Sequence, residues 1–583
     1  MKESAQSINK ESTNKESLNK VGIILGNQKN TPYEFYFLIS NDTIIQLDDI
    51  VFTKTEINGI SIYHYGIVVE INKYTEASNY AIETELMYNN KIPYLNVSVA
   101  KVLVTRIEPE IYIPPDPANE VYKAKKYETE LALYFDKMEN KIPIGFLRDN
   151  NVAYLNLDFI DGTNGAHVNI SGMSGIATKT TFATFLLYSL FQKSPNSHLY
   201  KAIVFNVKST DLLYLNKKNN FKNLKNSTKN ELIQQYELLD LKIEEFKNVS
   251  IMVPPKKNSI IKEKDIPDTS IQASLYYFTP AEIAKNNLLR FLFVDEIKDY
   301  QNLERIISHL EKHLLNILED TPQEFKKMGI LKTKENLKLK QKEFTIENLQ
   351  DLYTYLQEYL TENKNYLNES HSTIFAFLRR FRKISEDCNF LVGRETESKS
   401  NIIEKITNSN LTVIDVHNLP DKAKSFVVSS VLYLIYQRKE EEQDINKYFF
   451  VVDELNKYAP SHADTPIKDV LIDISERGRS LGIILIGAQQ TASLIESRIL
   501  SNCAIKVIGR SDAVEISKNY YSFLNEELRK RALLLKPGTM ILSQPDCPLP
   551  IVINFPYPCW ATRKEEVDNT QIIHQLNSIF KKI

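Results

Sequence analysis

A glycine-rich turn between an apolar strand and an apolar helix constrains the fold of this chain more than any other feature. The strand carries Val168 and Ile170, and the helix carries Phe182, Phe185 and Leu186. Glycines in such a turn let the backbone bend sharply and point successive N–H groups at an oxyanion, and the helix start adds partial positive charge. The pattern predicts a phosphate-binding turn formed by Gly172, Met173, Ser174, Gly175, Ile176, Ala177, Thr178, Lys179, Thr180 and Thr181.

A second apolar run ends in two carboxylates. Residues Tyr448 to Val452 have the pattern of a buried strand, and Asp453 and Glu454 follow directly. Because ligands of parallel α/β sheets bind at the carboxyl ends of strands, both motifs are expected at one edge of a sheet. There Lys179 would reach the β and γ phosphates of ATP. Thr180 and Asp453 would hold Mg²⁺, and Glu454 would orient and polarise the attacking water.

The turn departs from the usual pattern G-x-x-x-x-G-K-[ST]. Thr178 stands where the last glycine belongs, and the interval from Gly175 to Lys179 is one residue longer than in G-x-x-G-x-G-K-T. The threonine predicts looser phosphate binding or an altered turn. The motif therefore predicts nucleotide binding but not a fast rate of ATP hydrolysis. The alternative is an ordinary Gly-Ser-rich turn with a surface lysine, which the carboxylates Asp453 and Glu454 disfavour.

A third segment adds candidate residues for the same site. Arg477 and Arg479 precede an apolar strand that runs from Ile483 to Gly487, and Gln490 follows it. An amide just past a central strand can sense a γ-phosphate, and a guanidinium fork can bind the phosphate of a neighbouring subunit. The alternative, that both arginines pair with acidic neighbours such as Asp473 on a solvated helix end, stays open. Residues 206–211, which follow another apolar strand, are also candidates for lining a nucleotide pocket.

These motifs resemble the HerA branch of the HerA and FtsK superfamily of hexameric P-loop ATPases. The resemblance rests on the glycine turn, Val451-Val452-Asp453-Glu454, Gly478-Arg479-Ser480-Leu481-Gly482 and Gln490. It implies a homohexamer with ATP and Mg²⁺ between subunits, Arg477 or Arg479 acting across the interface, and double-stranded DNA in a central channel. The implied catalytic residues are Lys179, Glu454, Gln490, Arg477 and Arg479.

Three functional expectations follow from the resemblance. The first is an ATP-dependent DNA translocase or helicase. The unusual turn Ala177-Thr178-Lys179-Thr180 resembles that of HerA-type proteins that act with an effector partner in bacterial anti-phage systems. The second is therefore a nucleotide-controlled platform for a nuclease or a sirtuin-like NAD-consuming enzyme, and the third is a conjugation or secretion coupling ATPase.

The expected fold class is α/β: a RecA-like P-loop ATPase with a mostly parallel sheet, preceded by a small β-barrel and carrying a helical insertion. Short alternating runs early in the chain predict the barrel, and a Lys- and Glu-rich middle section predicts an all-helical insertion. The expected boundaries are a disordered tail over 1–20, a barrel over 21–112, the ATPase domain over 118–255 and 405–565, the insertion over 256–404, and a carboxyl-terminal helix over 566–583.

Composition restricts the expected DNA contacts and cellular location of the protein. A formal net charge of −2 argues against a protein that coats DNA generally, so any DNA contact is expected to be local. The four cysteines have no disulfide or zinc spacing, and no apolar stretch is long enough for a membrane span, so a cytoplasmic protein without membrane contact is expected.

His167 and His417 are expected to be structural. Residues 379–383 would touch nucleic acid or, as the favoured alternative, form a solvated helix face with Phe381 in the core.

Overall fold

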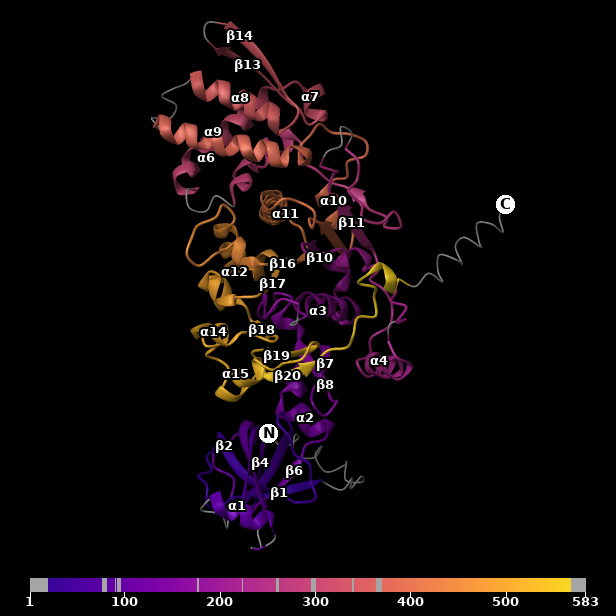
Figure 1. Cartoon of the computed structure of the whole chain (residues 1–583), viewed down its shortest axis with the longest axis vertical. Helices are drawn as coiled ribbons and strands as arrows, with labels where there is room; N and C mark the ends of the chain where they lie inside the picture. The colour runs from indigo at the N-terminus through magenta and orange to yellow at the C-terminus, as the bar shows by residue number, and fades with distance from the viewer. Residues whose placement is uncertain are drawn as a thin grey trace, which may run out of the picture. The chain divides into compact units, whose positions relative to one another are not determined.

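The computed structural model describes residues 19–75, 81–89, 91, 96–175, 178–222, 224–257, 262–294, 300–337, 340–362 and 370–567 (Figure 1). They form two compact units: one contains the residues up to 156 with 522–534 and 539–554, and the other contains 157–521, 535–538 and the residues from 555 on. Residues 118–156 thus group with the barrel rather than with the predicted ATPase domain. Most of the predicted tail and carboxyl-terminal helix lies outside the described residues.

The first unit contains a closed barrel with the strand order β1-β2-β5-β4-β3-β6. Alternate side chains of β2 are buried, and Phe35 and Phe37 are fully enclosed in the barrel core, as expected for strands with one face inward. Asn58 and Gly59, both with positive φ, form the turn that connects β3 to β4. The strands are β1 (Lys20–Ile24), β2 (Glu34–Ile39), β3 (Ile50–Ile57), β4 (Ile60–Thr75), β5 (Asn96–Glu108) and β6 (Glu120–Lys123).

The barrel closes through β6, which pairs with both β1 and β3 and lies beyond residue 112, where the predicted barrel ended. The same unit contains an antiparallel group in the order β19-β20-β7-β8. Its remaining elements are α1 (Ala81–Tyr88), α2 (Lys126–Ala132), β7 (Lys141–Phe146), β8 (Val152–Asn156), α15 (Glu526–Ala532), β19 (Thr539–Ser543) and β20 (Ile551–Asn554).

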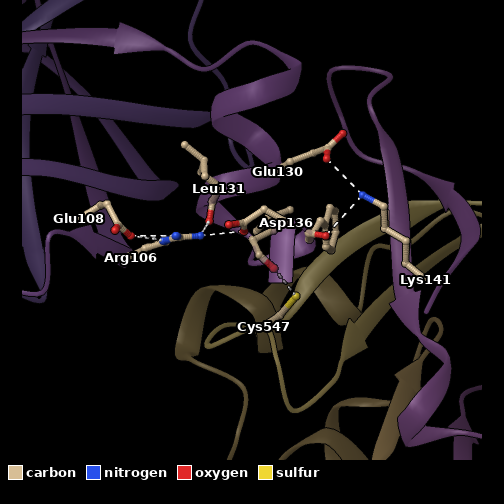
Figure 2. A network of polar contacts seen from close by, with 9 residues as sticks. Arg106, Glu108, Glu130, Leu131, Asp136, Lys141 and Cys547 are labelled. Atoms are coloured by element: carbon tan, nitrogen blue, oxygen red, sulfur yellow. Dashed lines mark hydrogen bonds and ion pairs between the residues drawn. The ribbon is translucent and has the colours of Figure 1, made fainter. Parts of the chain in front are cut away.

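A buried arginine ties the barrel to the segment that follows it (Figure 2). Arg106 of β5 is only 5% exposed in its side chain and donates to Asp136 at 2.7 Å, to Glu108 at 2.8 Å and to the carbonyl of Leu131 at 3.1 Å. Asp136 and Leu131 belong to the α2 region, so one guanidinium satisfies acceptors on two separate elements.

Replacing Arg106 with Met should lower the free energy of unfolding of this unit by about 2 kcal/mol, because Asp136 and the Leu131 carbonyl lose a charged donor. Hydrogen–deuterium exchange of β5 in urea would measure the loss. Lys101→Met on the same strand is the matched control: its pair with Glu34 is partly solvated and should contribute less than about 1 kcal/mol. Equal effects of the two variants would contradict the structural role of Arg106.

The second unit contains a parallel sheet with the order β12-β11-β15-β10-β16-β17-β9-β18. Every residue of β10 and β17 is buried, as expected for parallel strands covered on both faces. This sheet and the closed barrel confirm the predicted fold class. The strands are β9 (Val168–Ser171), β10 (Tyr200–Asn206), β11 (Val249–Val253), β12 (Ser274–Leu275), β15 (Leu411–Asp415), β16 (Lys447–Asp453), β17 (Ile483–Gln489) and β18 (Ile505–Ile508).

Helices connect most of these strands. Those that matter for the site are α3, which follows β9, α11, which precedes β16, and α12, which precedes β17. The helices of this unit other than α6 to α9 are α3 (Lys179–Lys193), α4 (Asn226–Leu238), α5 (Pro280–Lys285), α10 (Ile402–Asn408), α11 (Asp421–Glu441), α12 (Lys468–Leu481), α13 (Ser497–Asn502) and α14 (Ala513–Ile516). No helix among the described residues is long and apolar enough to cross a membrane.

The middle insertion is not all-helical, which corrects the prediction. Residues Leu331–Leu337 and Lys340–Ile346 form an antiparallel pair, β13 and β14, that extends from helices α8 and α9 (Figure 1). Alternating Lys and Glu residues resemble a charged helix in sequence, but here Lys332 and Glu343 pair across the strands at 2.9 Å. The helices are α6 (Tyr300–Asp320), α7 (Gln323–Lys327), α8 (Leu349–Glu362) and α9 (His371–Cys388).

The insertion does contain helices, as predicted, and three of them share one core. Leu303, Ile306, Ile307 and Leu310 of α6 are buried in one cluster with residues of α8 and α9. Phe381 of α9 is fully buried in the same cluster, so the structure agrees with the core-facing alternative for residues 379–383.

Candidate nucleotide site

The phosphate turn lies between β9 and α3, as its sequence predicts. The N–H of Gly172 donates to the carbonyl of Gln489 at 3.1 Å, and the N–H of Met173 donates to the carbonyl of Arg510 at 2.7 Å. These two N–H groups therefore anchor the turn to the ends of neighbouring strands. Ile176 and Ala177 lie outside the described residues.

Thr178 takes the conformation for which the usual pattern carries glycine. Its φ is 39° and its ψ is 34°, in the left-handed region, which is costly for a β-branched residue. Its hydroxyl accepts a hydrogen bond from the N–H of Gly538 at 3.3 Å. Thr178 thus adopts a backbone conformation that glycine would adopt more easily, and a contact from a distant segment holds it.

Lys179, the first residue of α3, is buried, with 6% of its surface exposed. Its ammonium donates to the carbonyls of Gly172 at 2.7 Å and Met173 at 3.2 Å. Burial lowers the pKa of Lys179 to about 8; Asp453 and Glu454 act in the opposite direction, and Lys208 lowers it further. The side chain is therefore folded back on its own turn and not turned to solvent, which disfavours the surface-lysine alternative.

The two carboxylates lie at the same edge of the sheet as the turn. Asp453 is opposite Ala488 of β17, and Ala488 is in turn opposite Ile170 of β9, in parallel registers. The N–H of Glu454 donates to the carbonyl of Ala488 at 2.8 Å, one residue before the carbonyl that holds Gly172. The end of β17 therefore fixes both halves of the site.

Both carboxylates are paired with lysines. Asp453 Oδ2 lies 2.8 Å from the ammonium of Lys208, which also lies 3.7 Å from Glu454 Oε1. The other oxygen of Glu454 lies 2.8 Å from Lys457. Burial raises the pKa of Glu454, but the ion pairs with Lys457 and Lys208 outweigh it, so its pKa lies below the usual value. Glu454 is thus held as a carboxylate.

A pocket of about 720 Å³ opens beside these groups. Its lining comes from the start of α3, from the segment after β10, from Asp453, and from two later stretches, 537–538 and 555–566. The residues include Thr178, Thr180, Thr181, Asn206, Val207, Lys208, Ser209, Asp211, Asp453, Gly538, Tyr557 and Arg563. Its volume lies in the range of small-molecule sites. The prediction that residues 206–211 help to line a pocket is confirmed for all of them except Thr210.

Gln490 lies apart from this pocket. It is exposed and, with Met173 and Ser174, lines a second hollow of about 620 Å³. The preceding residue, Gln489, is fully buried and its amide donates to Asn169. A sensing role for Gln490 stays a prediction.

The structure does not bring the two arginines to the phosphate turn of their own chain. They lie near the carboxyl end of α12, which leads into the amino end of β17, whereas the turn lies at the carboxyl ends of the strands. Arg477 pairs with Asp473 at 2.8 Å and Glu440 at 3.0 Å, and Arg479 donates to the carbonyl of Thr163 at 2.8 Å. The pairing of Arg477 is the alternative that the sequence left open. Action on a neighbouring subunit stays a prediction.

Gly478, between these arginines, is required by close packing. A Cβ at this position would lie 2.6 Å from His167 Cε1 and 2.6 Å from the carbonyl oxygen of Ile483. His167 is buried, and its Nδ1 accepts from the N–H of Leu485 at 3.0 Å. Burial lowers the pKa of His167 to about 4, so the ring is neutral and structural.

Sequence reasoning included Lys208 only as one of the candidate pocket residues 206–211 and did not predict its pairing with Asp453 and Glu454. It missed a second functional candidate, Glu566, altogether. Glu566 is buried and holds the pocket wall: it accepts from Tyr557 Oη at 2.9 Å and from Thr562 N and Oγ1, each at 2.9 Å. Nothing in the sequence around Glu566 signals this role.

Replacing Glu566 with Ala should weaken nucleotide binding about tenfold, because Tyr557 and Thr562 lose the acceptor that fixes the wall. Titration with a fluorescent ATP analogue would measure the change. Glu565→Ala is the matched control, since Glu565 is exposed and does not line the pocket. Unchanged affinity in a folded Glu566→Ala protein would contradict the role of this wall.

No protein-family model and no curated protein sequence matches this chain. Among solved structures, VirB4 of Thermoanaerobacter pseudethanolicus is 15% identical, with a TM-score of 0.44, over 72% of this chain and 96% of that chain. The plasmid coupling protein TrwB in complex with the non-hydrolysable ATP analogue ADPNP is 13% identical, with a TM-score of 0.44, over 74% and 93%. The genome packaging NTPase B204 from Sulfolobus turreted icosahedral virus 2 in complex with ATP-γS is 12% identical, with a TM-score of 0.21, over 27% and 74%.

Another TrwB structure is described as a bacterial conjugative coupling protein. These names are nearer to the conjugation-type alternative than to the HerA-type expectation, which no comparison confirms. With TM-scores below 0.5, the likenesses carry no argument about the function of this chain.

Proposed function

We propose that this chain is an ATP hydrolase of the P-loop class that works as a ring-forming motor. One observation supports the proposal above all: β17 fixes the phosphate turn of Lys179 and the carboxylates Asp453 and Glu454 at one edge of a parallel sheet, beside a pocket of about 720 Å³. A glycine turn, a buried lysine and paired acids at such an edge are the parts that phosphoryl transfer uses.

The residues present fit ATP and Mg²⁺. Asp453 Oδ1 is buried and has no hydrogen-bond partner among the described residues, and Thr180 lines the same pocket. Oxygen donors of this kind suit Mg²⁺, which would neutralise charge on the phosphates. In the proposed mechanism Lys179 exchanges its two carbonyl acceptors for phosphate oxygens. Glu454, held as a carboxylate, orients a water molecule and accepts its proton.

The finer assignment is a HerA-type homohexamer that moves double-stranded DNA, with Arg477 or Arg479 completing the site of a neighbouring subunit and Gln490 sensing the γ-phosphate. An effector such as a nuclease or an NAD-consuming enzyme would be its partner in anti-phage defence. A conjugation or secretion coupling ATPase, which would share the core site, is the alternative.

The experiment is ATP turnover by the purified chain at fixed salt, with and without double-stranded DNA, together with its mass in solution. A hexamer whose turnover rises several-fold on DNA would support the motor. A hexamer with slow turnover that DNA leaves unchanged would favour the platform for an effector. Absence of ATP binding and turnover in a folded protein would overturn the proposal.

A further inference from the structure

One ammonium lies between the two carboxylates of the site. Lys208 reaches them from the segment after β10, and its Nζ lies 2.8 Å from Asp453 Oδ2 and 3.7 Å from Glu454 Oε1. The side chain of Asp453 is 10% exposed, whereas that of Lys208 is 45% exposed. The lysine therefore lies against a mostly enclosed carboxylate, that of Asp453, while part of its own side chain stays in solvent.

The second lysine of the cluster is placed differently. Lys457 pairs with the other oxygen of Glu454 at 2.8 Å, three residues away in sequence. Lys208 and Asp453 line the pocket of about 720 Å³, whereas Lys457 does not. Of the two ammonium groups on Glu454, only that of Lys208 thus stands where an entering ligand would meet it.

We propose that Lys208 is a positioning residue that holds Asp453 and Glu454 in place and releases them when a divalent cation enters, an inference that rests on the proposed function. A divalent cation on the unpartnered Oδ1 of Asp453 and the ammonium of Lys208 on Oδ2 would share one carboxylate, so the two positive charges would repel each other at short range. Because the side chain of Lys208 is partly exposed, it has room to turn into the pocket. There its ammonium would meet the polyphosphate of a nucleotide bound together with the cation.

This exchange would make ATP hydrolysis depend on the arrival of the divalent cation. While Lys208 covers the acids, the charge on Glu454 is shared between two ammonium groups and is poorly placed to polarise water. With a cation and its nucleotide bound, Glu454 would keep Lys457 as its ammonium partner and lose Lys208. Lys208 would then be free to contact the terminal phosphate, an interaction that ATP offers and ADP lacks.

The test uses Mn²⁺ alone as the probe, with free Mn²⁺ read by electron paramagnetic resonance and no nucleotide present. Lys208→Met should bind Mn²⁺ at least about tenfold more tightly than the wild-type chain, because the competing charge is gone. Lys457→Met, the matched control, should change the affinity less than about threefold. Lys208→Arg, which keeps the charge, should return the affinity to the wild-type value.

A second readout is the ratio of ATP to ADP affinity, measured by displacement of a fluorescent nucleotide. Lys208→Met should lower this ratio at least about fivefold. Equal Mn²⁺ affinities in the wild-type and Lys208→Met chains, or equal gains in the Lys208 and Lys457 variants, would overturn the inference. The Mn²⁺ comparison does not depend on ATP hydrolysis. It therefore tests the role of Lys208 even if the wild-type chain does not hydrolyse ATP.

Discussion

Glu454→Gln is expected to reduce ATP turnover at least about a hundredfold while leaving ATP bound. The amide has nearly the size of the carboxylate, and the N–H of residue 454 still donates to the carbonyl of Ala488. The variant loses the negative charge that pairs with Lys457 and Lys208. It also loses the ability to accept a proton from water. Single-turnover hydrolysis and equilibrium ATP binding, measured on the same preparation, separate the two effects.

Glu476→Gln is the control for this substitution. Glu476 is exposed on α12 and belongs to neither cavity, so its variant should hydrolyse ATP like the wild-type chain. If Glu454→Gln hydrolyses ATP at the wild-type rate, the catalytic role assigned to Glu454 is wrong.

Lys179→Ala is expected to weaken ATP binding at least about a hundredfold and to abolish turnover. Charge-assisted hydrogen bonds to phosphate oxygens stabilise a complex by about 1.5–3 kcal/mol each, and the variant removes the donor. It also leaves the carbonyls of Gly172 and Met173 without the ammonium that now satisfies them, so the turn itself should loosen. Calorimetric titration with ATP would measure the loss of affinity.

Lys193→Ala makes a matched comparison, since Lys193 ends the helix that Lys179 begins and pairs at the surface with Asp240. Its ATP affinity should stay within about twofold of the wild-type value. Wild-type affinity in Lys179→Ala would show that the nucleotide does not use this turn.

The sequence predicted those parts of the site that are local in the chain. A strand, a glycine turn and a helix within residues 168–193 encode their own geometry, and the apolar run before Asp453 marks a buried strand by itself. The fold class followed because such strands, alternating with helices, favour a parallel sheet. These inferences needed only neighbouring residues.

The remaining parts depend on segments far apart in sequence. Thr178 is a tolerable replacement for glycine because Gly538 donates to it, and no local pattern reveals a partner 360 residues away. The pairing of Lys208 with Asp453 likewise depends on the sheet placing β10 beside β16. The sequence predicts helix over the hairpin β13–β14 because alternating Lys and Glu residues suit either structure, whereas the observed conformation depends on pairing between the two strands.

The wall of the nucleotide pocket has a consequence for synthesis of the chain. Residues 555–566, which carry Tyr557 and the buried Glu566, follow every strand of the parallel sheet in sequence. Chains emerge from the ribosome amino end first, so the phosphate turn and both carboxylates leave it before the wall does. The pocket beside the phosphate turn is therefore completed only after residues 555–566 have been translated.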